Sequence, residues 1–179
     1  MRQRPDTFLI DANVLITPFQ KYYPFDWAPG FWQCMEDAIL SRDVVLLDVV
    51  KKEILKGQAK PEKKDDLTKW IEEFSDRDVL SRKSEEIINM YSEVLKYVQT
   101  CGLYKANALK EWASPSVADA WLIASACTGG HIIITFETPN SGLSKNSPSK
   151  KAKIPDVGKH FSVECKDLFY MMRRLGFKL

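Results

Sequence analysis

The stretch Thr7–Ile16 constrains the fold more than any other part of the sequence. Phe8–Ile10 is a continuous apolar run, which is typical of a strand buried on both faces of a parallel sheet. Asp11 is the first polar residue after it, and Asn13 follows two residues later. Ligands bind at the carboxyl ends of strands in open α/β sheets, so Asp11 is a candidate site residue. Asp and Asn are also favoured N-caps, and a helix is expected from Val14, so the two roles are evenly balanced here.

Two further apolar runs predict buried strands, at Val44–Leu47 and His131–Thr135. Val79–Leu80 is a candidate short edge strand, and Phe161–Val163 is a candidate last strand. Apolar residues recur at helical spacing elsewhere, and helices are expected within residues 14–19, 31–39, 49–55, 61–74, 84–98, 104–112, 117–127 and 167–175. Strands that alternate with helices predict an α/β fold, a three-layer α/β/α sandwich with a mainly parallel sheet.

The chain length suits one domain over residues 1–179, with a sizeable core. The helical segment at about residues 60–113 is too long for a plain crossover and indicates a helical elaboration of that domain. A loop rich in Ser, Pro, Asn and Lys is expected at Thr138–Lys153, and Ile154–Val157 ends it.

Composition and charge narrow the function classes. The formal net charge of +2 excludes a global polycation, so any contact with nucleic acid has to come from a local patch. The sequence contains no run long enough for a transmembrane helix and no apolar signal segment, so a cytoplasmic location without membrane partners is expected. The four cysteines are widely spaced and indicate free thiols, and two histidines make a histidine-rich metal site improbable.

Asp119 is the most informative single residue. It is the only charged residue in Val117–Cys127, a segment that is apolar nearly all round and therefore predicts a helix inside the protein. A charge at a helix N-terminus is mildly stabilising when exposed, by about 0.3–1 kcal/mol, but burying an unpaired carboxylate costs several kcal/mol. No Lys or Arg lies between Lys110 and Lys145 to pair with it in the sequence.

Asp119 belongs to a set of carboxylates that the fold brings to one edge. In a parallel sheet, strand ends and the starts of the following helices share an edge, which places Asp11, Asp119 and Glu137 there. Glu53 reaches the same edge if its helix crosses there. Because converging carboxylates repel one another, a divalent cation is expected, and oxygen ligands select Mg²⁺ or Mn²⁺. Such a site suits phosphodiester hydrolysis, and no Ser-His-Asp set or phosphate-binding glycine loop competes with it.

Four motifs in order resemble the PIN-domain nucleases, and most closely the VapC-like toxins of bacteria and archaea. They are Phe8–Asn13, Glu53 in an early helix, Val117–Ala124 and Ile133–Glu137. The resemblance covers about the whole chain. It implies an α/β/α sandwich and a Mg²⁺- or Mn²⁺-dependent endoribonuclease that acts on RNA. It also implies a toxin of a toxin–antitoxin pair, held inactive by an antitoxin protein and frequently a homodimer.

The resemblance also assigns roles by position. It makes Asp11, Glu53, Asp119 and Glu137 the acidic, catalytic metal site, and Asn13 and Thr135 the supporting residues that orient it. The fourth acid of the family is usually Asp, whereas this chain has Glu137. Asp156 follows the flexible loop and is a second candidate for that place, although a role in the turn is slightly favoured. The long helical segment indicates a separate subfamily.

Two groups of residues are candidates for contacts with RNA. Loop lysines would bind phosphates, or else belong to a solvated loop: Lys145, Lys150, Lys151 and Lys153. Aromatic residues after the first helix would stack on unpaired bases, although packing locally or at a dimer interface is favoured: Tyr22, Tyr23, Phe25 and Trp27.

Two alternatives to a nuclease remain. The first is a non-catalytic PIN-like protein-interaction module, in which the acids serve only structure. The second is a phosphatase of the aspartyl-phosphate type, which also has Asp after its first strand. That class needs a second Asp two residues on, where this chain has Asn13, so it is the weaker alternative.

Overall fold

The computed structural model describes residues 6–56 and 64–179, and its centre is a parallel sheet of five strands. The strands are ordered β3-β2-β1-β4-β5. The three apolar runs form the inner strands β1 (Phe8–Ile10), β2 (Val44–Leu47) and β4 (Ile132–Ile134), as predicted. The edges are the short strands β3 (Val79–Leu80) and β5 (Cys165–Lys166).

Strand register brings the ends of β1 and β4 level. Phe8 pairs with Val44 on one side and with Ile132 on the other, and Ile10 pairs with Ile134. The chain runs from β1 to β2 and β3 in one direction, and later places β4 and β5 on the opposite side of β1. The strand order therefore reverses between β1 and β4. In open α/β sheets this switch point, at the carboxyl ends of the strands, is where ligands bind.

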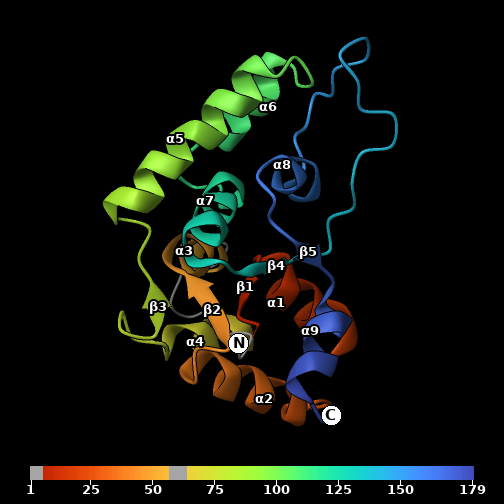
Figure 1. Cartoon of the computed structure of the whole chain (residues 1–179). Coiled ribbons are helices and arrows are strands. Elements are labelled where there is room, and N and C mark those ends of the chain that lie inside the picture. The colour runs from red at the N-terminus through yellow and green to blue at the C-terminus, as the bar shows by residue number, and fades with distance from the viewer. Residues whose placement is uncertain (1–5, 57–63) are drawn as a thin grey trace, which may run out of the picture.

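Helices cover both faces of the sheet, so the molecule is a three-layer α/β/α sandwich. Figure 1 shows α7 and α8 on one side of the sheet and α2 and α9 on the other, with α5 and α6 stacked beyond α7. The helices are α1 (Asn13–Thr17), a π-helical turn (Pro18–Tyr22), α2 (Pro29–Leu40), α3 (Asp48–Lys56), α4 (Asp66–Glu72), α5 (Glu85–Thr100), α6 (Ala106–Trp112), α7 (Asp119–Gly129), α8 (Ile154–His160) and α9 (Leu168–Leu175).

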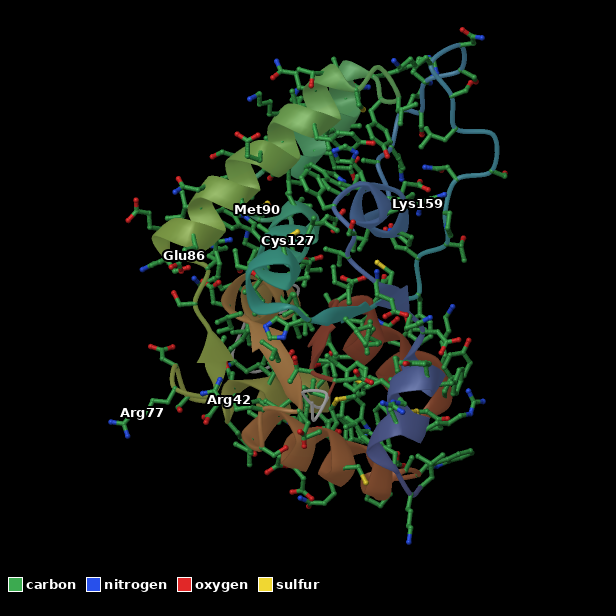
Figure 2. The ribbon with its side chains drawn as sticks, in the orientation of Figure 1. Arg42, Arg77, Glu86, Met90, Cys127 and Lys159 are labelled. Atoms are coloured by element: carbon green, nitrogen blue, oxygen red, sulfur yellow. The ribbon has the colours of Figure 1, made fainter. Side chains whose placement is uncertain are left out.

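Helix α7 lies inside the protein, as its nearly uniform apolar sequence predicts. Helix α5 packs along it, and the buried side chains of Val94 and Val98 belong to the core. Tyr91 of α5 stacks on Trp121 of α7 with ring centroids 3.7 Å apart. Figure 2 shows Met90 of α5 near Cys127 of α7, and both residues line one pocket between the elements.

The helical elaboration expected at about residues 60–113 contributes buried side chains to the core, among them Trp70, Val94 and Trp112. Its first predicted helix, at residues 61–74, corresponds to α4. That helix begins at Asp66 and is capped by the carboxylate of Asp65, which accepts a hydrogen bond from the backbone N–H of Thr68. Residues 61–63 of that prediction lie outside the described residues.

Two local predictions were wrong. Phe161–Val163 is not the last strand, because Ser162 has a left-handed backbone (φ 57°) and pairing with β4 occurs two residues later, at Cys165. Residues 154–157 do not simply end a loop, since they form the first turn of α8. The helix expected within residues 14–19 is short, because α1 ends at Thr17, directly before Pro18, and the chain then continues into a π-helical turn.

The loop at residues 138–153 is anchored at its far end. The backbone N–H of Ser149 donates to the carbonyl of Leu103 at 2.9 Å, and the N–H of Lys105 donates to the carbonyl of Ser149 at 2.8 Å. These bonds fasten the loop to the segment between α5 and α6. The chain therefore enters α8 from a fixed position.

Cys34, Cys101, Cys127 and Cys165 are free thiols, as predicted. Among residues 6–56 and 64–179, no helix is long and apolar enough to cross a membrane.

Candidate functional site

The site begins at Asp11, directly after β1. Its backbone N–H donates to the carbonyl of Ile134 at 3.0 Å, which continues the β1–β4 ladder and fixes the residue at the switch point. The carboxylate is buried, with the residue only 4% exposed. Helix α1 has Ala12 as its N-cap and no side-chain capping bond. The N-cap role considered for Asp11 and Asn13 is therefore not found.

Thr135 ties the ends of the two central strands together. Its hydroxyl donates to Oδ2 of Asp11 at 2.9 Å and accepts from the backbone N–H of Glu137 at 3.1 Å. Asn13 makes a longer contact, with Nδ2 3.4 Å from the same carboxylate oxygen. Thr135 is buried and Asn13 is exposed, so Thr135 is the stronger of the two supports for Asp11.

Asp119 is the first residue of α7 and carries the most perturbed carboxyl group of the site. Burial is the main cause that raises its pKa to about 8, and the charges of Asp11, Glu137, Glu53 and Glu111 raise it further. All four of these neighbouring charges are negative. In the part of the chain that the structure describes, the carboxyl of Asp119 has no hydrogen bond and no ion pair.

Glu53 reaches the site from α3, as the sequence expectation required. Its carboxylate accepts a hydrogen bond from the backbone of Ala118, the residue that precedes α7. Burial of the carboxyl end and the charge of Asp11 raise the pKa of Glu53, although the residue as a whole is exposed. Glu53 therefore lies at the rim of the acidic cluster, beside the N-terminus of α7.

Glu137 faces the cluster on one side and helix α8 on the other. Its Oε2 accepts from the backbone N–H of Ile154 at 2.7 Å, and its Oε1 pairs with Nζ of Lys153 at 3.1 Å. Its negative charge nevertheless raises the pKa of both Asp11 and Asp119. Glu137 is thus part of the electrostatic cluster while both of its oxygens have donors.

Asp156 is separated from this set. Its carboxylate accepts from the backbone N–H of Asn140 at 3.1 Å and from the side-chain Nδ2 of Asn140 at 2.8 Å. Its charge acts on Tyr97 and Tyr104 and is absent from the charges that act on Asp11, Glu53 and Asp119. Asp156 lies in the first turn of α8 and holds Asn140 across the loop, which is a long-range contact and not the local turn role favoured from sequence.

The four loop lysines lie in different surroundings. Lys153 pairs with Glu137 at the acidic cluster. Lys145 lies by Gly102, at the far end of the loop, and Lys150 and Lys151 are exposed. Only the Lys153 ammonium contacts a carboxylate of the cluster among the residues that the structure describes.

The four aromatic candidates for base stacking also differ in how they pack. Phe25 stacks on Trp32 with ring centroids 4.1 Å apart, and Tyr23 lies 4.8 Å from Phe31. Tyr22 and Trp27 are exposed, by 56% and 84%. The ring of Tyr22 also meets that of Tyr23, with centroids 6.4 Å apart, so local packing accounts for Phe25 and Tyr23 and in part for Tyr22.

Two features of the site were missed from sequence. Glu111 of α6 adds a fifth negative charge near Asp119. The N-terminus of α8 supplies a backbone donor to Glu137. Nothing in the sequence near either residue signals this, because both contacts depend on how α6 and α8 pack.

The acidic cluster suits a hard cation that keeps several waters better than one enclosed by protein ligands alone. Over residues 6–56 and 64–179, no three His, Cys, Asp or Glu side chains are drawn together tightly enough to hold a metal ion as they stand. Mg²⁺ usually keeps several waters and takes only one or two carboxylates from the protein, together with phosphate oxygens of a substrate. Asp11 and Asp119 provide such oxygens, and their mutual repulsion is of the kind that a cation offsets.

Fold and site together define an α/β protein with an acidic cluster at the switch point of a parallel sheet. Residues 8–179 match the model of the family described as Domain of unknown function (DUF4411), and the chain belongs to that family. The match spans all five strands and every carboxylate of the cluster. No curated protein matches the sequence.

Proposed function

We propose that this protein is a Mg²⁺- or Mn²⁺-dependent endoribonuclease that hydrolyses RNA phosphodiester bonds. The observation that carries the proposal is the carboxyl of Asp119, whose pKa is about 8 because it is buried among other carboxylates. Strongly perturbed titratable groups cluster at functional sites, and ligands bind at the switch point of an open α/β sheet. The motif order shared with the PIN-domain nucleases, and with VapC-like toxins in particular, supports the same assignment.

Asp11 and Asp119 are the proposed ligands of the cation, and Glu53 and Glu137 complete the acidic, catalytic set. A cation bound there would activate a water and offset charge on the scissile phosphate. Thr135 holds Asp11 in place through its 2.9 Å hydrogen bond, and Asn13 assists at the solvent side. Asp156 has no part in the proposed ligand set, since Asn140 occupies its carboxylate.

Lys153 is the proposed contact to the RNA backbone. Its ammonium is half-buried, lies 3.1 Å from Glu137 and carries the positive charge that a phosphate next to the cluster would meet. Lys153→Met should weaken RNA binding. It should also reduce the slope of log affinity against log salt concentration by about one, as expected for the loss of one phosphate contact. Lys96→Met on α5 is the matched control, because that ammonium is exposed and remote in the chain. The contacts assigned to Lys145, Lys150 and Lys151 remain predictions.

The partners of the proposed toxin follow from the same resemblance. We propose that an antitoxin protein holds the enzyme inactive, that two copies form a homodimer, and that both act in the cytoplasm. The exposed side chains of Tyr22 and Trp27 are available for such contacts. Light scattering on the purified protein gives its molecular mass and so tests whether it is a dimer. The toxin role is tested by expressing the protein in cells. Growth should stop, and co-expression of a small neighbouring gene that encodes the antitoxin should restore it.

One observation favours a second candidate, a non-catalytic PIN-like protein-interaction module. The described residues form no tight group of three metal-ligating side chains. In that case the acids would serve structure only, and RNA would stay intact with or without divalent cations.

Cleavage of a labelled single-stranded RNA separates the two candidates. The nuclease should cut in Mg²⁺ or Mn²⁺, stop in chelator, and lose at least about 100-fold in rate in Asp11→Asn and Asp119→Asn. Glu86→Gln is the control, since Figure 2 shows Glu86 at the outer end of α5 and its carboxylate is exposed. Equal cleavage by the wild type and both Asp variants would remove the proposal.

A further inference from the structure

A hollow of about 400 Å³ opens directly beside the acidic cluster. It lies where β4 and β5 end, next to the first turn of α9. Thr135 and Glu137 line the hollow and also belong to the cluster. Whatever occupies the hollow is therefore adjacent to whatever the carboxylates bind.

The walls of the hollow are mainly apolar. Four of the lining residues carry rings: Phe136, Pro139, Pro155 and Phe169. Phe169 is 41% exposed, although the neighbouring Leu168, Met171 and Met172 of the same helix are buried. The core does not require the Phe169 side chain, which leaves its ring at the rim of the hollow.

The charged residues around the hollow already have partners. The carboxylate of Asp167 caps α9 by accepting from the backbone N–H of Tyr170 at 2.7 Å. The ammonium of Lys166 pairs with Glu164 at 2.8 Å. With these charges engaged, the hollow suits a flat, uncharged ring with polar edges better than it suits a phosphate.

We propose that this hollow is a subsite for an unpaired nucleobase of the RNA, one that neighbours the phosphate held at the acidic cluster. The proposal rests on the nuclease function above and deepens it, because a base can enter the hollow only when it is unstacked. Aromatic side chains bind such bases by stacking, with little preference among the four. The substrate class is therefore single-stranded RNA rather than a duplex.

Binding of short RNA, measured by fluorescence anisotropy with Ca²⁺ as the only divalent cation, tests the subsite. The probes are a labelled eight-nucleotide oligo(A) and an abasic ribose-phosphate chain of the same length. Phe169→Ala should weaken binding of oligo(A) by roughly 5- to 100-fold, the range expected for one stacked base, and leave the abasic chain unchanged. Phe169→Tyr, which keeps the ring, should bind like the wild type.

Ile88→Ala is the matched control, because Ile88 is 44% exposed and lies on α5. It should bind both probes like the wild type. A second measurement needs no variant: with 2-aminopurine placed at each position of the oligomer in turn, binding should raise the fluorescence at the position whose base leaves its neighbours and enters the hollow.

Two results would overturn the subsite while the nuclease stands. One is equal affinity of the wild type and Phe169→Ala for oligo(A), and the other is an equal loss for both probes, provided that the wild type cleaves RNA. The absence of any position-specific rise in fluorescence would have the same meaning. A wild type that neither binds nor cleaves RNA would instead overturn the nuclease proposal and the subsite with it.

Discussion

At the scale of single residues, Asp119 shows how strongly the surroundings of one carboxyl group can change its chemistry. Its position at the start of a buried helix, next to other carboxylates, holds it mostly protonated at neutral pH. Its place in an apolar segment with no basic neighbour is visible in the sequence. The identity of the four charges around it is not visible there, since they come from α3, α6 and the ends of β1 and β4.

The raised pKa of Asp119 predicts that the metal-free protein loses stability as the pH rises. The folded state binds this proton more tightly than the unfolded chain, with pKa values of about 8 and 3.8. The stabilising contribution is therefore complete below about pH 4 and is lost as the pH rises to about 8. Partial exposure reduces the effect, which leaves roughly 2–3 kcal/mol between pH 5 and pH 8.

Urea unfolding in chelator at these two pH values measures this loss. Asp119→Asn should remove the pH dependence that Asp119 causes, and Glu86→Gln should behave like the wild type. The same pH dependence in Asp119→Asn as in the wild type would show that Asp119 is not the responsible group.

Thr135 makes a second prediction at the residue scale. Thr135→Val keeps the shape but leaves the buried Asp11 without its 2.9 Å donor, and leaves the N–H of Glu137 without its acceptor. The free energy of unfolding should fall by about 1–3 kcal/mol, and RNA cleavage should fall with it. Thr135→Ser retains the hydroxyl and should recover most of both. Equal stability of the Val and Ser variants would contradict the role of this bond.

At the scale of elements, helix α8 is held to the sheet by Glu137. Glu137→Ala removes the acceptor for the Ile154 N–H and the partner of Lys153, whereas Glu137→Gln retains an oxygen for the Ile154 N–H. The Ala variant should lose about 1–2 kcal/mol of stability and the Gln variant less. Hydrogen exchange should accelerate in the first turn of α8 in the Ala variant only. Unchanged exchange there would contradict the capping role.

The elements also show what sequence reasoning can and cannot reach. The inner strands were predictable because Phe8–Ile10 and Val44–Leu47 are buried on both faces and therefore have uninterrupted apolar sequences. Strand β5 was not, because Cys165–Lys166 is a half-buried pair whose strand character comes only from its pairing with β4. Helix α8 was also missed, since Pro155 and seven residues give little helical periodicity.

For the candidate site, the sequence indicated which residues belong to it, but not which contacts hold their side chains in place. Asp11, Asp119 and Glu137 could be placed on one edge because strand ends and helix starts share it. Glu53 required α3 to cross that edge, and its bond to Ala118 depends on tertiary packing. The contact between Glu137 and Ile154 joins residues across a whole loop, which no local pattern specifies.

At the scale of the whole molecule, the helical segment before α7 is part of the core. Replacing residues 85–112 with a short Gly/Ser linker removes α5 and α6 and uncovers α7. The shortened chain should fail to fold cooperatively, because the buried Val94, Val98 and Trp112 would be lost together. Thermal melting followed by circular dichroism measures this. A cooperative transition near that of the full chain would show instead that the segment is a detachable insertion.

The proposed nuclease activity depends on a divalent cation at the acidic cluster. Calorimetric titration of Mn²⁺ into the wild type, Asp119→Asn and Glu86→Gln tests this most directly. We expect saturable binding to the wild type and to Glu86→Gln, weakened by roughly tenfold or more, about 1.4 kcal/mol, in Asp119→Asn. No saturable binding to the wild type, or the same affinity in Asp119→Asn, would contradict a metal site formed by these carboxylates.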